Sequence, residues 1–227
     1  MEILRQGSRS DQVKLAQRLL NKKTKAAKPL KEDGVFGPLT RTALTSFQQR
    51  ERITADGTVG PGTWGRLGIK RDVTHPIVLF PQPTNVTCWS ASATMILGNM
   101  SVGPGKAAIP GGGLDPSPEN VKIFANGLGW QMHYPQTWTV TGLALLLQRN
   151  PAWAVGGGNS PGGGQWLHAI VLSGFWTDLD PDGSGTMIRV HDPWPPGIGS
   201  IYGRFYRGTV DGFDFISMYI LQPYVSQ

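Results

Sequence analysis

An eight-residue pattern occurs twice near the start of the chain and limits what this segment can form. D-G-V-F-G-P-L-T at 33–40 recurs as D-G-T-V-G-P-G-T at 56–63, which is 23 residues later. In each copy an Asp-Gly turn precedes an apolar residue, and a Gly-Pro precedes a Thr that enters a helix. Ser10 can cap an earlier helix whose apolar residues recur at helical spacing from Val13 to Leu20. We therefore expect a three-helix unit whose two turns are related by pseudo-symmetry.

Positive charge is concentrated in the same part of the chain. Residues 1–72 contain 15 Lys and Arg against 7 Asp and Glu, whereas residues 73–227 contain 6 against 8. The first segment thus carries +8 and the remainder −2. This asymmetry favours a polyanionic partner for the first segment: nucleic acid, a membrane surface or an anionic cell-wall polymer. A solvated face that serves only solubility is the alternative.

The segment L-G-I-K-R-D-V-T-H-P at 67–76 is short and polar and ends in a proline, so we place a domain boundary there. The expected domains are 1–72 and 75–227. No apolar run approaches the length of a membrane span, and M-E-I-L-R-Q-G-S lacks the pattern of a secretory signal. Export by the general route is therefore not expected.

The first segment resembles the peptidoglycan-binding domain that is fused to many bacterial cell-wall hydrolases. The resemblance covers residues 1 to about 70 and rests on L-R-Q-G-S-R-S-D-Q-V-K-L-A-Q-R-L-L followed by the doubled D-G-x-x-G-x-x-T pattern. It implies a small helical module that holds a catalytic domain against the wall. The insert N-K-K-T-K-A-A-K-P-L-K at 21–31 is more basic than the usual loop of this family. Added affinity for anionic wall polymers and simple solubility both explain it.

Cys88 is the only cysteine of the 227 residues, in T-N-V-T-C-W-S-A-S at 84–92. A lone cysteine is either a small buried hydrophobe or a nucleophile. Thr84, Asn85 and Thr87 are good helix N-caps, and small and apolar residues continue to Gly98. Cys88 is therefore expected in the first turn of a helix, where the helix dipole stabilises a thiolate. Such a nucleophile also needs a base and a group that orients the base.

The strongest strand signal of the chain contains a histidine. W-L-H-A-I-V-L-S-G-F-W includes His168 and is followed by the turn D-P-D-G-S-G at 180–185 and by T-M-I-R-V-H-D-P. An antiparallel hairpin would bring Asp192 beside the strand that carries His168. The register cannot be read to one residue, so His191 remains a rival orienter or a surface residue.

These residues together resemble the papain-like cysteine peptidases, especially a compact bacterial branch in which Asp replaces the usual Asn. The resemblance covers roughly 75–227 and implies an α+β fold with the catalytic helix packed on an antiparallel sheet. It implies that Cys88 attacks, that His168 is base and then acid, and that Gln82 donates to the oxyanion. Asp192 would accept a hydrogen bond from His168 Nδ1, and Trp89 and Trp166 would contact substrate. V-T-C-W replaces G-S-C-W, so substrate preferences are not transferred.

No cofactor or metal is expected. D-L-D-P-D-G-S-G at 178–185 resembles the start of a calcium loop, but Arg189 stands where a bidentate Glu is needed and Pro181 interrupts the spacing. A plain hairpin turn is the favoured interpretation. Zinc is not indicated, because the chain lacks an H-x-x-x-H pattern.

The two resemblances together imply a cell-wall hydrolase that cleaves amide or peptide bonds in the peptide stems of peptidoglycan. The partner is then peptidoglycan rather than nucleic acid, with no membrane span. Delivery to the periplasm or wall without a visible signal suits an antibacterial effector, whose cognate immunity protein would be a further partner, or a phage lysin. Before export the protein would be cytoplasmic. The alternatives are a protease that acts on proteins and a catalytically inactive wall-binding protein.

Overall fold

The computed structural model describes residues 1–98, 112–115, 117–136, 138–159, 165–206 and 219–223. The chain divides into two compact units. The first comprises Met1–Asp72, Phe175–Met187 and Gly203–Arg207, and the second comprises Val73–Gly174, Ile188–Tyr202 and Gly208–Gln227. The elements are helices and an antiparallel sheet, so the expected α+β class is confirmed.

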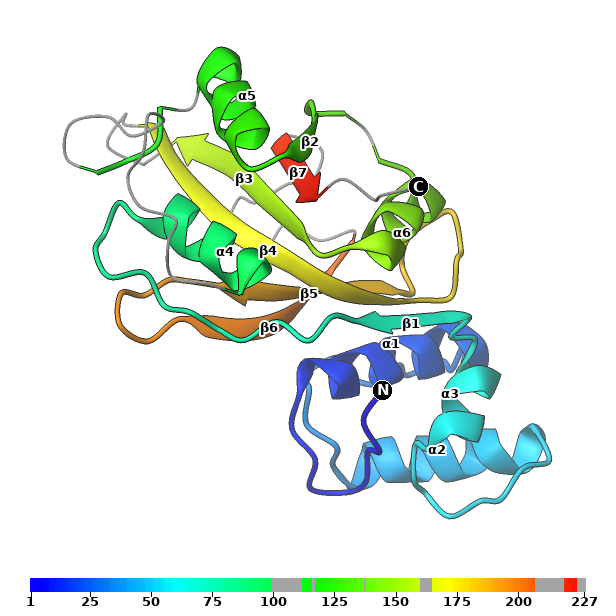
Figure 1. Ribbon diagram of the computed structural model, residues 1–227. Coiled ribbons are helices and arrows are strands. Elements are labelled where there is room, and N and C mark those ends of the chain that lie inside the picture. Colours follow the sequence, from blue (N-terminus) through cyan, green and yellow to red (C-terminus); the bar gives the residue numbers. More distant parts are fainter. Residues whose placement is uncertain (99–111, 116, 137, 160–164, 207–218, 224–227) are drawn as a thin grey trace. The chain divides into compact units, whose positions relative to one another are not determined.

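Three helices form in the first unit, as expected: α1 (Asp11–Thr24), α2 (Pro38–Arg50) and α3 (Pro61–Leu67) (Figure 1). The Ser10 hydroxyl caps α1 and accepts a hydrogen bond from the amide of Val13 at 3.3 Å. Both α2 and α3 begin with a proline directly after a glycine, Gly37 or Gly60. Proline suits this position because its missing N–H would have no intrahelical partner there. The repeated sequence therefore starts two helices in the same way.

Two buried glutamines make the same hydrogen-bond network in the two repeated turns. Gln17 donates from Nε2 and accepts at Oε1, and its partners are Asp33 Oδ1 (3.0 Å), Val35 O (3.1 Å), Thr40 Oγ1 (3.2 Å) and Gly34 N (3.0 Å). Gln48 repeats this with Asp56 Oδ1 (3.1 Å), Thr58 O (2.9 Å), Thr63 Oγ1 (3.3 Å) and Gly57 N (3.0 Å). The pseudo-symmetry of the sequence is thus a repeated side-chain to backbone network.

The apolar residue of each repeated turn enters the core of this unit. Phe36 and Val59 are 1% and 0% exposed, and they pack with the apolar faces of the helices. The same core also contains Trp176 and Met187, which lie far along the chain at the ends of two strands. The core of the first unit is therefore not made from its N-terminal residues alone.

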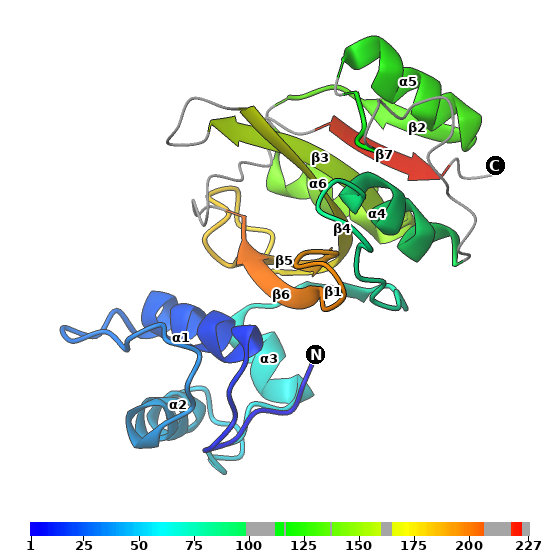
Figure 2. The same ribbon diagram turned by 90° about the vertical axis from the view of Figure 1, so that its left-hand side faces the viewer.

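The sheet has the strand order β2-β7-β3-β4-β5-β6, and β1 pairs with β4 outside this path. Its strands are β1 (Arg71–Thr74), β2 (Trp130–His133), β3 (Ala152–Asn159), β4 (Gln165–Thr177), β5 (Thr186–Asp192), β6 (Ser200–Phe205) and β7 (Tyr219–Pro223). Figure 2 shows β7 between β2 and β3. Gly174 permits the approach of β1, because a Cβ there would overlap the Val73 carbonyl.

Three further helices are α4 (Cys88–Leu97), α5 (Pro118–Gly127) and α6 (Val140–Arg149). Helix α4 lies against β3 and β4 (Figure 1), and its small residues allow close contact with the strands. Ser92 Oγ donates to the carbonyl of Ala169 on β4 at 3.0 Å. This contact holds the helix that begins at Cys88 next to the strand that carries His168. None of the helices in the described part of the chain has the length and apolar character of a membrane span.

Candidate active site

Cys88 is the first residue of α4 and its thiol is half-buried. Thr87 occupies the N-cap position, but its hydroxyl does not cap the helix as the sequence led us to expect. It bonds instead within the preceding turn, to the amide of Thr84 at 3.1 Å and to its carbonyl at 3.2 Å. The Thr87 hydroxyl therefore does not compete with the sulfur for the amides of the first turn.

His168 on β4 and Asp192 at the end of β5 form a close pair. His168 Nε2 donates to Asp192 Oδ1 at 2.6 Å, and each side chain is 14% exposed. The expectation from the sequence that Nδ1 makes this bond is wrong, because Nε2 is the ring nitrogen that contacts Asp192. Since Nε2 is engaged by Asp192, Nδ1 is the nitrogen left for Cys88.

The surroundings of His168 favour the charged imidazolium. Burial lowers its pKa, but the hydrogen bonds to Asp192 and then to Cys88, with the negative charges of both, outweigh burial and raise the pKa to about 9. His168 is therefore protonated at neutral pH and is paired on one side with a carboxylate and on the other with sulfur. This arrangement places an imidazole between a carboxylate and a sulfur, as a cysteine nucleophile and its base require.

His191 lies on the opposite side of β5 and does not contact this pair. It is 0% exposed, and its Nδ1 is 2.8 Å from Ser173 Oγ. Burial first, and then the charge of Arg189, lower its pKa to about 4, so it is neutral. The sequence did not decide whether Asp192 or His191 faces His168. Successive residues of a strand point to opposite faces of the sheet, and in the structure it is Asp192 that faces His168.

Both oxygens of Asp192 are held by further donors. The amide of Trp194 donates to Oδ1 at 2.9 Å, and the hydroxyl of Tyr202 on β6 donates to Oδ2 at 3.1 Å. Sequence reasoning missed Tyr202, because no motif marks it and it reaches Asp192 only through the pairing of β5 with β6. The carboxylate that holds His168 is thus fixed from two sides.

Gln82 is fully buried and is tied to the segment that follows Asp192. Its amide donates to Pro193 O, and its carbonyl accepts from Gly197 N, both at 3.0 Å. Its side chain donates from Nε2 to Thr84 O at 2.6 Å, and its Oε1 has no partner among the described residues. One hydrogen of the amide group is therefore engaged, and the second is the donor that an oxyanion would need. The role of Gln82 stays a prediction.

Trp89 and Trp166 are the two tryptophans that the sequence predicts to contact substrate. The side chain of Trp166 lies outside the described part of the chain. Trp89 is 2% exposed, donates to Gly112 O at 3.0 Å and packs edge-on against Phe124 in the core. Trp153, which sequence reasoning missed, donates to the carbonyl of Trp89 at 3.0 Å and so anchors the first turn of α4.

The acidic loop 178–185 forms the turn between β4 and β5, and its carboxylates contact a lysine. Within the described residues there is no group of three or more His, Cys, Asp or Glu that could hold a metal ion.

Comparison with protein families agrees with this geometry. Residues 9–67 match the model of a peptidoglycan binding domain. Residues 69–201, more than half of the chain, match the family described as papain-like cysteine protease AvrRpt2. This segment contains Gln82, Cys88, His168 and Asp192. The chain therefore belongs to the AvrRpt2 family of papain-like cysteine proteases, and it carries a peptidoglycan binding domain in front of the protease domain.

Proposed function

We propose that this cysteine protease cleaves amide or peptide bonds in the peptide stems of peptidoglycan, with Cys88 as nucleophile. The observation that carries the proposal is the pairing of His168 with Asp192 on one side and Cys88 on the other. The family match supports the reaction class, and the peptidoglycan binding domain at 9–67 supports the proposed wall substrate.

In the first step the Cys88 thiolate attacks the carbonyl carbon of the scissile bond and its electrons move to the oxygen. The backbone N–H of Cys88 and the remaining Nε2–H of Gln82 hold this oxyanion. A donor of this kind typically lowers the barrier by about 3 to 4 kcal/mol. His168, protonated because its pKa is about 9, gives its Nδ1 proton to the leaving amine as the C–N bond breaks.

The second step hydrolyses the thioester. His168, now neutral, takes a proton from water, and the resulting hydroxide attacks the acyl carbon and breaks the C–S bond. Asp192 keeps the imidazole in place through both steps, because its two oxygens are bound by three donors. The thiolate and imidazolium are then restored.

A wall substrate requires the enzyme to act outside the cytoplasm. We propose delivery into another cell as an antibacterial effector, with an immunity protein that protects the producer. The family description, which names a protease, favours a second candidate function: cleavage of proteins at the wall.

Purified sacculi and casein separate the two substrates. We expect soluble fragments from sacculi, and mass spectrometry should show a new amino group in the stem peptide or at its link to the sugar. Casein should be cut much more slowly at equal enzyme concentration. Rapid casein cleavage together with intact sacculi would establish the protein substrate instead.

A further inference from the structure

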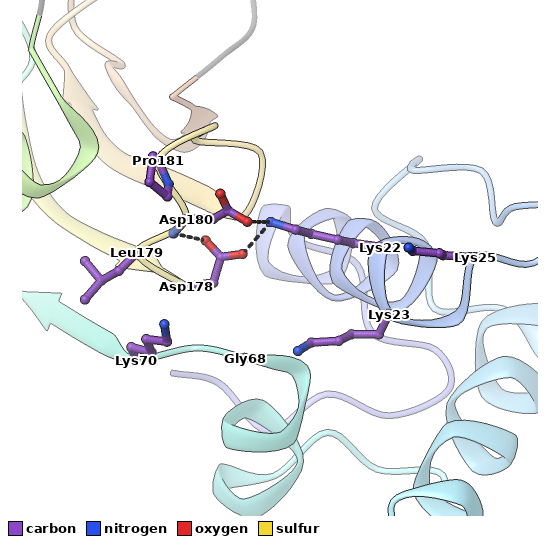
Figure 3. Close-up of a pocket in the computed structure, with 9 residues that line it drawn as sticks. All are labelled: Lys22, Lys23, Lys25, Gly68, Lys70, Asp178, Leu179, Asp180 and Pro181. Carbon is purple, nitrogen blue, oxygen red and sulfur yellow. Dashed lines mark hydrogen bonds and ion pairs between the residues drawn. The ribbon is translucent and has the colours of Figure 1, made fainter.

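Two features of the sequence have no part in the chemistry above: the basic insert at 21–31 and the acidic loop at 178–185. Both belong to the first compact unit, where they border one hollow of about 500 Å³ (Figure 3). Its charged lining consists of Lys22, Lys23, Lys25, Lys70, Asp178 and Asp180.

The carboxylates in this hollow already have partners on every oxygen. Asp178 accepts from the amide of Asp180 on Oδ1 (3.0 Å) and from Lys22 Nζ on Oδ2 (2.8 Å). Asp180 accepts from the amide of Asp182 on Oδ1 (3.2 Å) and from the same Lys22 Nζ on Oδ2 (2.8 Å). Burial lowers the pKa of Lys22, but these two hydrogen bonds outweigh it and raise the pKa. The acidic loop is thus satisfied by a lysine of α1.

The charged groups of the hollow that can still form hydrogen bonds are lysine ammonium groups, which act as donors. Lys23, Lys25 and Lys70 make no side-chain hydrogen bond or ion pair with the residues that the structure describes. The lining of the hollow contains four lysines and two aspartates. Asp182 is a third carboxylate nearby, with its Oδ1 3.7 Å from Lys22 Nζ. The net charge stays positive, so a ligand must be an anion that accepts hydrogen bonds.

Gly68, the residue that ends α3, lies against the Lys23 side chain at the edge of the hollow. Gly68 has a φ of +109°, and a Cβ at this position would lie 3.3 Å from Lys23 Cε and 3.5 Å from its Nζ. Figure 3 shows the Lys23 side chain extending toward Gly68. Lys25 and Leu179, with φ of 45° and 58°, both border the hollow in the left-handed region. Lys25 adopts this conformation because it is the C-cap of α1, with its amide bonded to the carbonyl of Asn21.

We propose that this hollow binds a phosphate group, supplied by the phosphodiester of an anionic wall polymer. A phosphate offers several acceptor oxygens in a tetrahedral arrangement, which suits lysines that approach from different elements, whereas a carboxylate offers two in one plane. The choice of a wall polymer as the source rests on the proposed function; the phosphate chemistry rests on the hollow alone. The basic insert then has a binding role in addition to solubility.

Calorimetric titration of the full-length protein tests this with two probes, inorganic phosphate and a short poly(glycerol phosphate), at low ionic strength. We expect both to bind, and we expect Lys23→Gln with Lys70→Gln to weaken binding at least about tenfold. The matched control is Lys28→Gln with Lys31→Gln. It removes the same charge from the same module, but these lysines border a different hollow, so binding should change by less than about twofold.

Equal weakening by the two double variants would overturn the proposal, since it would show diffuse attraction. So would the absence of saturable phosphate binding, or equal competition by a phosphate-free stem peptide, which would assign the hollow to carboxylates. Binding of inorganic phosphate with no tighter binding of the polymer would reject a polymer source. Cleavage of soluble stem peptides should be unchanged in all variants, so failure of the binding site and failure of the proposed function are observed separately.

Discussion

Asp192 accepts hydrogen bonds on both carboxylate oxygens, and His168 depends on it for orientation and for charge. Its hydrogen bond is the largest of the contributions that raise the His168 pKa against burial. A substitution at Asp192 therefore changes both the position and the titration of the imidazole.

Asp192→Ala should move the alkaline limb of kcat/KM to lower pH. The protonated imidazole is the active form, so activity is lost as pH rises through its pKa, which is about 9 with Asp192 in place. Without Asp192, burial still lowers that pKa and only Cys88 opposes it, so the limb should shift toward about 6.5. Activity at pH 7 should fall by about two orders of magnitude or more. The pH profile of kcat/KM measures both effects.

Asp192→Asn serves as the comparison, because its carbonyl can still accept from His168, and activity should decrease in the order wild type, Asn, Ala. An alanine variant near wild type beside an inactive His191→Ala would contradict the assignment of Asp192.

Tyr202→Phe removes one donor to Asp192 and leaves the ring in place. A hydrogen bond to a charged group contributes about 1.5 to 3 kcal/mol. Its loss should raise the activation free energy by part of this amount, because Asp192 positions His168. We expect kcat to fall roughly tenfold with KM unchanged, and the alkaline limb to shift by a fraction of a pH unit. Tyr134→Phe, at an exposed tyrosine, is the control and should leave kcat, KM and the pH profile unchanged. A change in KM alone would assign Tyr202 to substrate binding rather than to positioning.

At the scale of elements, the two repeated turns depend on Gln17 and Gln48. Each glutamine is nearly or fully buried and makes four hydrogen bonds, so its loss leaves buried backbone groups without partners. Gln48→Ala should lower the free energy of unfolding by about 2 to 4 kcal/mol, and Gln17→Ala by a similar amount. Urea denaturation measures both.

Gln49→Ala provides the matched control, because Gln49 is the exposed neighbour of Gln48 on the same helix. It should change the free energy of unfolding by less than about 0.5 kcal/mol. Equal effects of Gln48→Ala and Gln49→Ala would show that helix propensity, and not the network, stabilises the turns.

Local patterns predicted the elements that depend on neighbours in sequence. The Gly-Pro starts of α2 and α3, the helix at Cys88 and the hairpin that carries His168 and Asp192 follow from spacing and turn chemistry. The register that turns Asp192 rather than His191 toward His168 does not follow from them. Tyr202, Trp153 and the insertion of β7 between β2 and β3 could not be predicted, because each depends on pairing of distant segments. The ring nitrogen of His168 was assigned wrongly, since spacing carries no information on ring orientation.

At the scale of the whole molecule, the first unit takes core residues from the distant segment Phe175–Met187. Trp176 and Met187 are 5% and 0% exposed within the same cluster as Leu19 and Phe47. Nothing in the local pattern marks these two residues as partners of the N-terminal helices. A fragment of residues 1–72 lacks both side chains, each of which contributes about 1.5 to 3 kcal/mol by burial. Wall binding is therefore better measured with the full chain than with this fragment.

The central claim is that Cys88 cleaves the peptide part of peptidoglycan, and the most direct test compares wild type with Cys88→Ala on purified sacculi. The fall in turbidity should be at least about a hundredfold slower for Cys88→Ala, because loss of a nucleophile usually removes several orders of magnitude. The variant should still sediment with sacculi and unfold at the same temperature. More than about a hundredth of the wild-type rate in Cys88→Ala, or wild type that leaves sacculi intact, would contradict the account.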